Sequence, residues 1–113
     1  MEKSQIKENV FGNILRFKTK PFPVPFSVQI ISKVPNSLRK LVVSDGLNTK
    51  TVHLSSKYDY LTEMNILKEN TIITIFEIKR FPTNKSELFV DNISIEKEKQ
   101  VGVKIGDPKP INI

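Results

Sequence analysis

From Phe26 onward the sequence alternates apolar and polar residues with a period of two, the pattern of a β-strand with one buried face. Five segments in all are predicted to be strands, the fourth of them apolar on both faces, and turn-forming residues such as Gly, Pro, Asn and Asp separate most of them. The segments span residues 26–33, 38–43, 49–54, 71–78 and 88–95. Between the third and the fourth, Ser55 or Ser56 can cap a helix that continues to about Leu67. The sequence therefore predicts a small β-structure with one inserted helix.

The remaining segments flank these strands. Ile6, Val10 and Ile14 share one face at helical spacing, so residues 1–18 are predicted to form an N-terminal helix. Alternating prolines make residues 21–25 an extended connector, residues 26–96 form the barrel, and residues 97–113 form a C-terminal extension. We expect a single all-β domain with flanking helices, built as a five-stranded OB-fold barrel with a helix between its third and fourth strands. Four residues of that helix are expected to face inward: Tyr60, Leu61, Met64 and Leu67.

The positive charge of the chain is concentrated in its first third. The net charge is +6, and residues 9–44 contain no Asp or Glu. That stretch holds six basic residues: Arg16, Lys18, Lys20, Lys33, Arg39 and Lys40. The charges of residues 1–8 and of residues 45–113 each sum to zero. Two interpretations stay open, namely a generally basic surface that keeps the protein in solution and a patch that faces an anionic partner.

Residues that carry catalysis or bind metals are scarce. The chain has no cysteine, which excludes disulfides and thiolate metal sites, and one histidine alone cannot ligate a metal. That histidine, His53, lies between Val52 and Leu54 in a predicted strand, so it faces away from both. There is no glycine-rich phosphate loop, and no long apolar run suggests a signal peptide or a membrane span. We expect a binding domain without cofactor or metal rather than an enzyme.

Two segments are more specific than the strand pattern. Residues 44–49 (SDGLNT) follow the second strand, and residues 101–108 (VGVKIGDP) come after the last. Both resemble segments of the N-terminal domain of the replication protein A large subunit, in the same order and at similar spacing. A divergent paralogue of that subunit, for example a telomere-directed version, has the same resemblance.

The resemblance implies a function. In that family the domain is chiefly a nuclear protein-docking module of a single-stranded-DNA-binding replication and repair factor. Its basic cleft, between the loop after the first strand and the loop between the last two strands, binds acidic amphipathic segments of replication, repair and checkpoint proteins. It binds single-stranded DNA only weakly, and the other subunits of the complex contact other parts of the parent protein. No membrane partner is implied.

Carried over residue by residue, the resemblance implies a cleft with a basic rim and an apolar floor. The basic rim consists of Lys33, Arg39, Lys40, Lys79, Arg80 and Lys85, and the floor consists of Val52 and Leu54. Glu77 departs from the family, where an arginine lies nearby, and lysine mostly replaces arginine. Each position also has a plain structural interpretation: the floor residues can be core, the lysines can be solvated loop charges, and Lys79 and Arg80 can protect an apolar strand from aggregation.

A second hypothesis makes single-stranded DNA, including telomeric DNA, the main ligand. Such binding needs exposed aromatic platforms beside a basic groove. The chain has no Trp, Phe26 and Phe76 fall at predicted core positions, and both tyrosines belong to the predicted helix. This shortage favours protein docking. The discriminating observation is whether Phe81 and Phe89 point outward beside the lysines.

Overall fold

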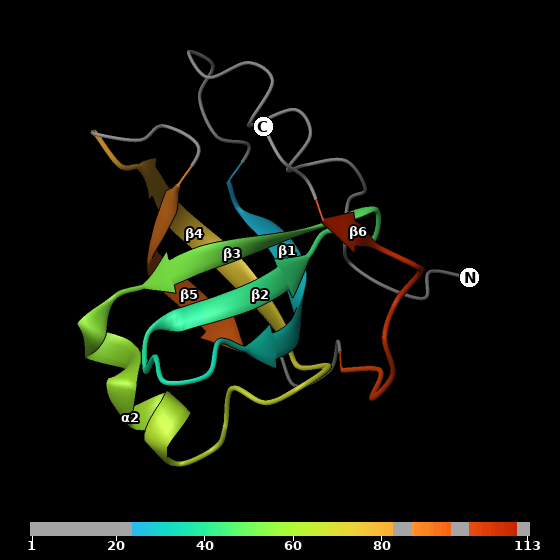
Figure 1. Ribbon diagram of the computed structural model, residues 1–113, viewed down its shortest axis with the longest axis horizontal. Coiled ribbons are helices and arrows are strands. Elements are labelled where there is room, and N and C mark those ends of the chain that lie inside the picture. The colour runs from blue at the N-terminus through green and yellow to red at the C-terminus, as the bar shows by residue number, and fades with distance from the viewer. Residues whose placement is uncertain (1–23, 83–86, 96–99, 111–113) are drawn as a thin grey trace.

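The computed structural model describes residues 24–82, 87–95 and 100–110 (Figure 1). Its elements are β1 (Phe26–Lys33), β2 (Lys40–Ser44), β3 (Asn48–Leu54), the 3-10 turn η1 (Ser56–Tyr58), α2 (Asp59–Glu63), β4 (Ile72–Arg80), β5 (Leu88–Ile95) and β6 (Lys109–Pro110). The five predicted strands correspond to β1–β5. The helix predicted over residues 1–18, residues 21–23 of the connector and Lys85 lie outside the described residues.

The five long strands close into a barrel (Figure 1). β1 pairs antiparallel with β2 and with β4, β2 pairs antiparallel with β3, and β4 pairs antiparallel with β5. The parallel pairing of β3 with β5 completes the circle. β6 is an extra strand that pairs parallel with the start of β3. The protein is thus mostly β, with a closed five-stranded barrel, an arrangement consistent with an OB-fold.

Alternate strand residues fill the barrel, because β-branched and other aliphatic side chains pack well on the inner face of a pleated sheet. The core consists of Phe26, Val28, Ile30, Leu41, Val43, Val52, Leu54, Leu67, Ile73, Ile75, Ile78, Leu88, Val90 and Ile93. Val52 and Leu54 are only 1% and 3% exposed. Their side chains point into the barrel, so they do not provide the apolar floor of a surface cleft.

Phe76 corrects the prediction that it belongs to the core. Its side chain is 41% exposed, whereas Phe26 is buried as predicted. Phe76 follows the buried Ile75, and the register of β4 against β5 shifts between Ile75 and Glu77. Because β4 is apolar on both faces, its sequence period does not reveal which face is the inner one.

The reversal between β2 and β3 is built by Asp45 and Gly46. A carboxylate oxygen of Asp45 accepts hydrogen bonds from the backbone N–H groups of Leu47 (2.9 Å) and Asn48 (2.7 Å). Gly46 has a φ of +94°, as predicted for this turn. The buried carboxylate therefore satisfies the two N–H groups that water would otherwise bind, and this stabilises the turn.

The inserted helix is shorter than predicted. Ser55 caps it by accepting a hydrogen bond from the N–H of Lys57, but α2 ends at Glu63 and Asn65 adopts a φ of +57°. Tyr60 and Met64 are 56% and 67% exposed, so the prediction that they face inward is wrong. The preceding 3-10 turn has three residues per turn and changes which side chains face the barrel. The inward prediction is confirmed for Leu61 and Leu67, and Tyr58 packs against the core in addition.

The C-terminal segment, residues 100–110, packs on the outside of the barrel and ends in β6 (Figure 1). Gln29 of β1 is fully buried and donates hydrogen bonds to the carbonyls of Asn70 (3.1 Å) and Val103 (2.6 Å). Its side-chain oxygen accepts a hydrogen bond from the N–H of Ile105 (2.7 Å). One buried amide therefore joins three segments of the chain.

Candidate docking surface

Four residues form a line across four adjacent strands on the outside of the barrel. The strand register pairs Lys40 of β2 with His53 of β3, His53 with Phe89 of β5, and Phe89 with Lys79 of β4. We call these four residues the outer row. Each neighbours buried core residues in sequence, so alternation directs the four side chains away from the core. Lys40 and Lys79 are exposed, and His53 and Phe89 are half-buried.

The centre of the outer row is aromatic. Phe81, just after β4, contacts both neighbours: its ring centroid lies 4.8 Å from that of His53 and 6.1 Å from that of Phe89. The ring planes are inclined by 71° and 79°, an edge-to-face geometry. His53 Nε2 also lies 3.3 Å from a carboxylate oxygen of Glu87. Phe89 therefore lies outside the barrel in the outer row with Lys40 and Lys79, and Phe81 packs beside it.

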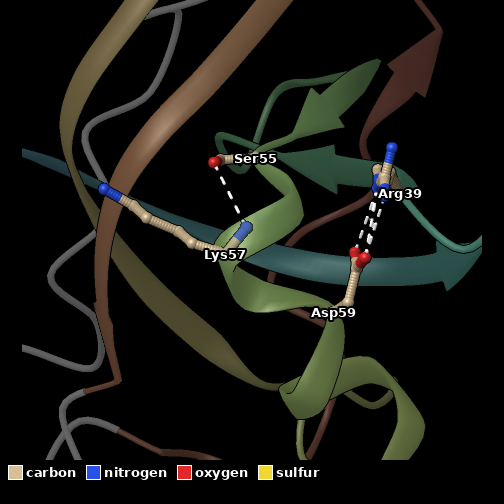
Figure 2. A network of polar contacts seen from close by, with 4 residues as sticks. All are labelled: Arg39, Ser55, Lys57 and Asp59. Atoms are coloured by element: carbon tan, nitrogen blue, oxygen red, sulfur yellow. Dashed lines mark hydrogen bonds and ion pairs between the residues drawn. The ribbon is translucent and has the colours of Figure 1, made fainter.

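Two other predicted residues are held near α2. Lys33, the last residue of β1, donates a hydrogen bond of 3.0 Å from Nζ to the side-chain oxygen of Asn65. Arg39 contacts both carboxylate oxygens of Asp59 at 3.0–3.3 Å (Figure 2). The hydrogen bond and the charge of Asp59 raise the pKa of Arg39 above the ordinary value for arginine. These two contacts hold the β1–β2 loop beside α2.

The remaining basic position is Arg80, at the end of β4. It pairs in register with the buried Leu88, and its side chain is partly buried. Burial lowers the pKa of Arg80 from its ordinary value. Arg80 thus directly follows Lys79 along β4 and is not itself part of the outer row. Of the predicted site residues that the structure describes, only Lys40 and Lys79 belong to the outer row.

The sequence did not predict that His53 and Phe89 belong to the candidate site. It also did not predict that Asp59 lies beside Arg39. His53 was placed on the outer face by its buried neighbours Val52 and Leu54, but nothing local revealed that Phe89 lies next to it. Asp59 lies in the first turn of α2, a position where acidic residues are common in any helix. Its contact with Arg39 depends on the path of the loop between β1 and β2.

An open pocket of about 450 Å³ lies apart from these residues. It is formed by the connection between α2 and β4 together with Ile95 and the start of the C-terminal segment. Its lining includes Ile66, Lys68, Asn70, Gln100 and Gly102. None of the lining residues belongs to the predicted cleft.

Comparisons with known proteins add no identification: no family model matches the chain, and no curated protein matches it. Among residues 24–82, 87–95 and 100–110, no three His, Asp or Glu side chains cluster so that they could hold a metal ion. In the same part of the chain, no helix has the length and apolar character needed to cross a membrane.

Proposed function

We propose that this domain is an OB-fold docking module that binds acidic amphipathic segments of partner proteins on the outer row and Phe81. The observation that supports this most is the register, which sets two exposed lysines at the ends of an aromatic centre. An acidic partner segment needs both features, because apolar contact supplies affinity that salt does not screen and the lysines supply charge complementarity.

The dimensions of the outer row suit a short helix. Four adjacent strands place Lys40 and Lys79 about 14 Å apart along the sheet, at about 4.8 Å per strand. Because the barrel wall curves away on both sides of the aromatic centre, a helix on this centre, with a rise of about 5.4 Å per turn, meets the lysines through acidic residues near its ends, toward which the long lysine side chains can extend. Apolar residues between them on the same helix face would then contact His53, Phe81 and Phe89.

The resemblance of residues 44–49 and 101–108 to the replication protein A large subunit supports the same function. On this proposal the parent is a nuclear factor of DNA replication or repair, or a telomere-directed paralogue. Its partners are replication, repair or checkpoint proteins with acidic segments, and the domain has no catalytic activity. The apolar contact surface is His53, Phe81 and Phe89 rather than the buried Val52 and Leu54.

Titration of a fluorescein-labelled acidic amphipathic peptide, read by anisotropy, tests this proposal. The double variant Lys40→Glu/Lys79→Glu should lose most of the binding of the parent domain. The matched control Lys68→Glu/Lys104→Glu makes the same change of charge at exposed positions elsewhere and should keep most of it. Equal losses in the two double variants would show that net charge alone governs binding.

The outward position of Phe81 and Phe89 favours a second candidate, single-stranded DNA as the main ligand. Base stacking contributes about 1–3 kcal/mol per base where an aromatic face is open. Here the rings contact one another edge to face, which uses part of that surface and favours the docking proposal. An oligo-dT titration at physiological salt separates the two: affinity tighter than that for the acidic peptide, lost in Phe89→Ala, would support DNA.

A further inference from the structure

Arg39 and Asp59 form a two-pronged ion pair at the edge of the proposed docking surface (Figure 2). Arg39 Nε lies 3.1 and 3.3 Å from the two carboxylate oxygens, and a terminal guanidinium nitrogen lies 3.0 Å from one of them. This is the geometry in which arginine binds any carboxylate or phosphate. Arg39 directly precedes Lys40, the first residue of the outer row.

Arg39 lies largely in solvent, and Asp59 is half-buried. The side chains of Arg39 and Asp59 are 55% and 25% exposed. Exposed ion pairs add little to the stability of a fold, so holding α2 does not by itself account for this one. The backbone of Arg39 is fixed independently, because its carbonyl accepts a hydrogen bond of 2.7 Å from the N–H of Leu54. The guanidinium can therefore exchange Asp59 for another anion by side-chain rotation alone.

We propose that Asp59 occupies the anion site of Arg39 in the unbound protein, and that an oxyanion of the docking partner displaces it. This inference rests on the proposed function. Asp59 is then an internal competitor that lowers the affinity for weakly acidic segments. A phosphorylated serine in the partner competes better than a glutamate, because it carries more negative charge and three acceptor oxygens. Only an oxyanion that Arg39 binds more tightly than it binds Asp59 therefore adds appreciably to the affinity of the partner.

The test compares two neutralising variants in the full chain. Asp59→Asn removes the internal competitor. Asp91→Asn removes an equal charge from a similarly exposed pair, Lys57–Asp91, whose charged atoms lie 3.7 Å apart, and leaves the Arg39–Asp59 contact in place. Binding is measured by anisotropy with one labelled acidic peptide in two forms, with glutamate or with phosphoserine at one position. Thermal melting followed by circular dichroism checks that each variant is folded.

Asp59→Asn should bind the glutamate peptide about two- to five-fold tighter than Asp91→Asn does, the range that an exposed ion pair allows. Binding of the phosphoserine peptide should tighten by at least the same factor, because every anion that binds Arg39 must first displace Asp59 in the parent protein, and Arg39→Ala should abolish both gains. Equal affinities in the two neutralising variants would overturn the inference, as would a gain that persists in Arg39→Ala/Asp59→Asn. If the parent binds no acidic peptide, the proposed function fails along with it. If the parent binds and the outer-row lysine variants lose binding, unchanged affinity in Asp59→Asn overturns this inference alone.

Discussion

Gly106 lies against the backbone of Gly46, so closely that a Cβ atom on Gly106 would be 2.6 Å from the carbonyl oxygen of Gly46. The contact joins the turn after β2 to the C-terminal segment, 60 residues later in the sequence. A backbone hydrogen bond of 3.0 Å from Lys109 to Leu47 lies beside it. Residues 44–49 and residues 101–108 are therefore in contact, and the close approach explains why glycine occupies both positions.

This contact predicts unequal costs for two alanine substitutions. Gly102 and Gly106 both have positive φ values, +74° and +72°, so each alanine should cost about 1–2 kcal/mol for the backbone conformation. Only Gly106→Ala adds a clash with fixed backbone, because nothing lies within 4 Å of a Cβ on Gly102. Urea denaturation should show Gly106→Ala to be the less stable variant. Equal midpoints for the two variants would contradict the close approach.

The buried amide of Gln29 predicts that the C-terminal segment contributes to the stability of the barrel. Gln29→Leu leaves the N–H of Ile105 and the carbonyl of Val103 without that partner, which should cost about 1–3 kcal/mol. Asn48→Ala removes an exposed hydrogen bond to Lys109 and should change stability by less than about 0.5 kcal/mol. Chemical denaturation measures the free energy of unfolding of both variants. Similar losses of stability would mean that Gln29 does not couple the C-terminal segment to the barrel.

Neighbouring residues on opposite faces of β3 should separate stability from binding. Leu54→Ala empties a core position and should destabilise the protein by about 2–5 kcal/mol. His53→Ala removes an outer ring and should cost less than about 1.5 kcal/mol. At a temperature where both variants are folded, peptide affinity should fall only in His53→Ala. A selective loss in Leu54→Ala would instead place the docking surface elsewhere.

The strands of this fold could be predicted because their signal is local. Alternation in β1 and β3, and the Asp45–Gly46 turn between β2 and β3, each depend on a few adjacent residues. The outer face of β4 could not be predicted, since the strand carries apolar residues on both faces and Phe76 is one that lies on the outside. The end of α2 was also predicted wrongly. The helical spacing of apolar residues does not reveal that the segment begins with a 3-10 turn or that Asn65 adopts a positive φ after the helix ends.

The candidate site could be predicted only in part, because it depends on pairing between distant strands. Alternation alone directed His53 outward, but the parallel register of β3 with β5 brings Phe89 next to it. Lys33 and Arg39 were expected to face a partner, yet the loop that carries them lies against Asn65 and Asp59. Such contacts follow from the closed barrel and have no local sequence signal.

Chemical-shift mapping tests the docking surface most directly. An unlabelled acidic amphipathic peptide is titrated into ¹⁵N-labelled protein, and the backbone amide shifts are followed by NMR. The account predicts that the largest shifts occur at His53, Phe81 and Phe89, with smaller ones at Lys40 and Lys79. Shifts confined to the pocket residues Lys68, Gln100 and Gly102, with no change along the outer row, would contradict it.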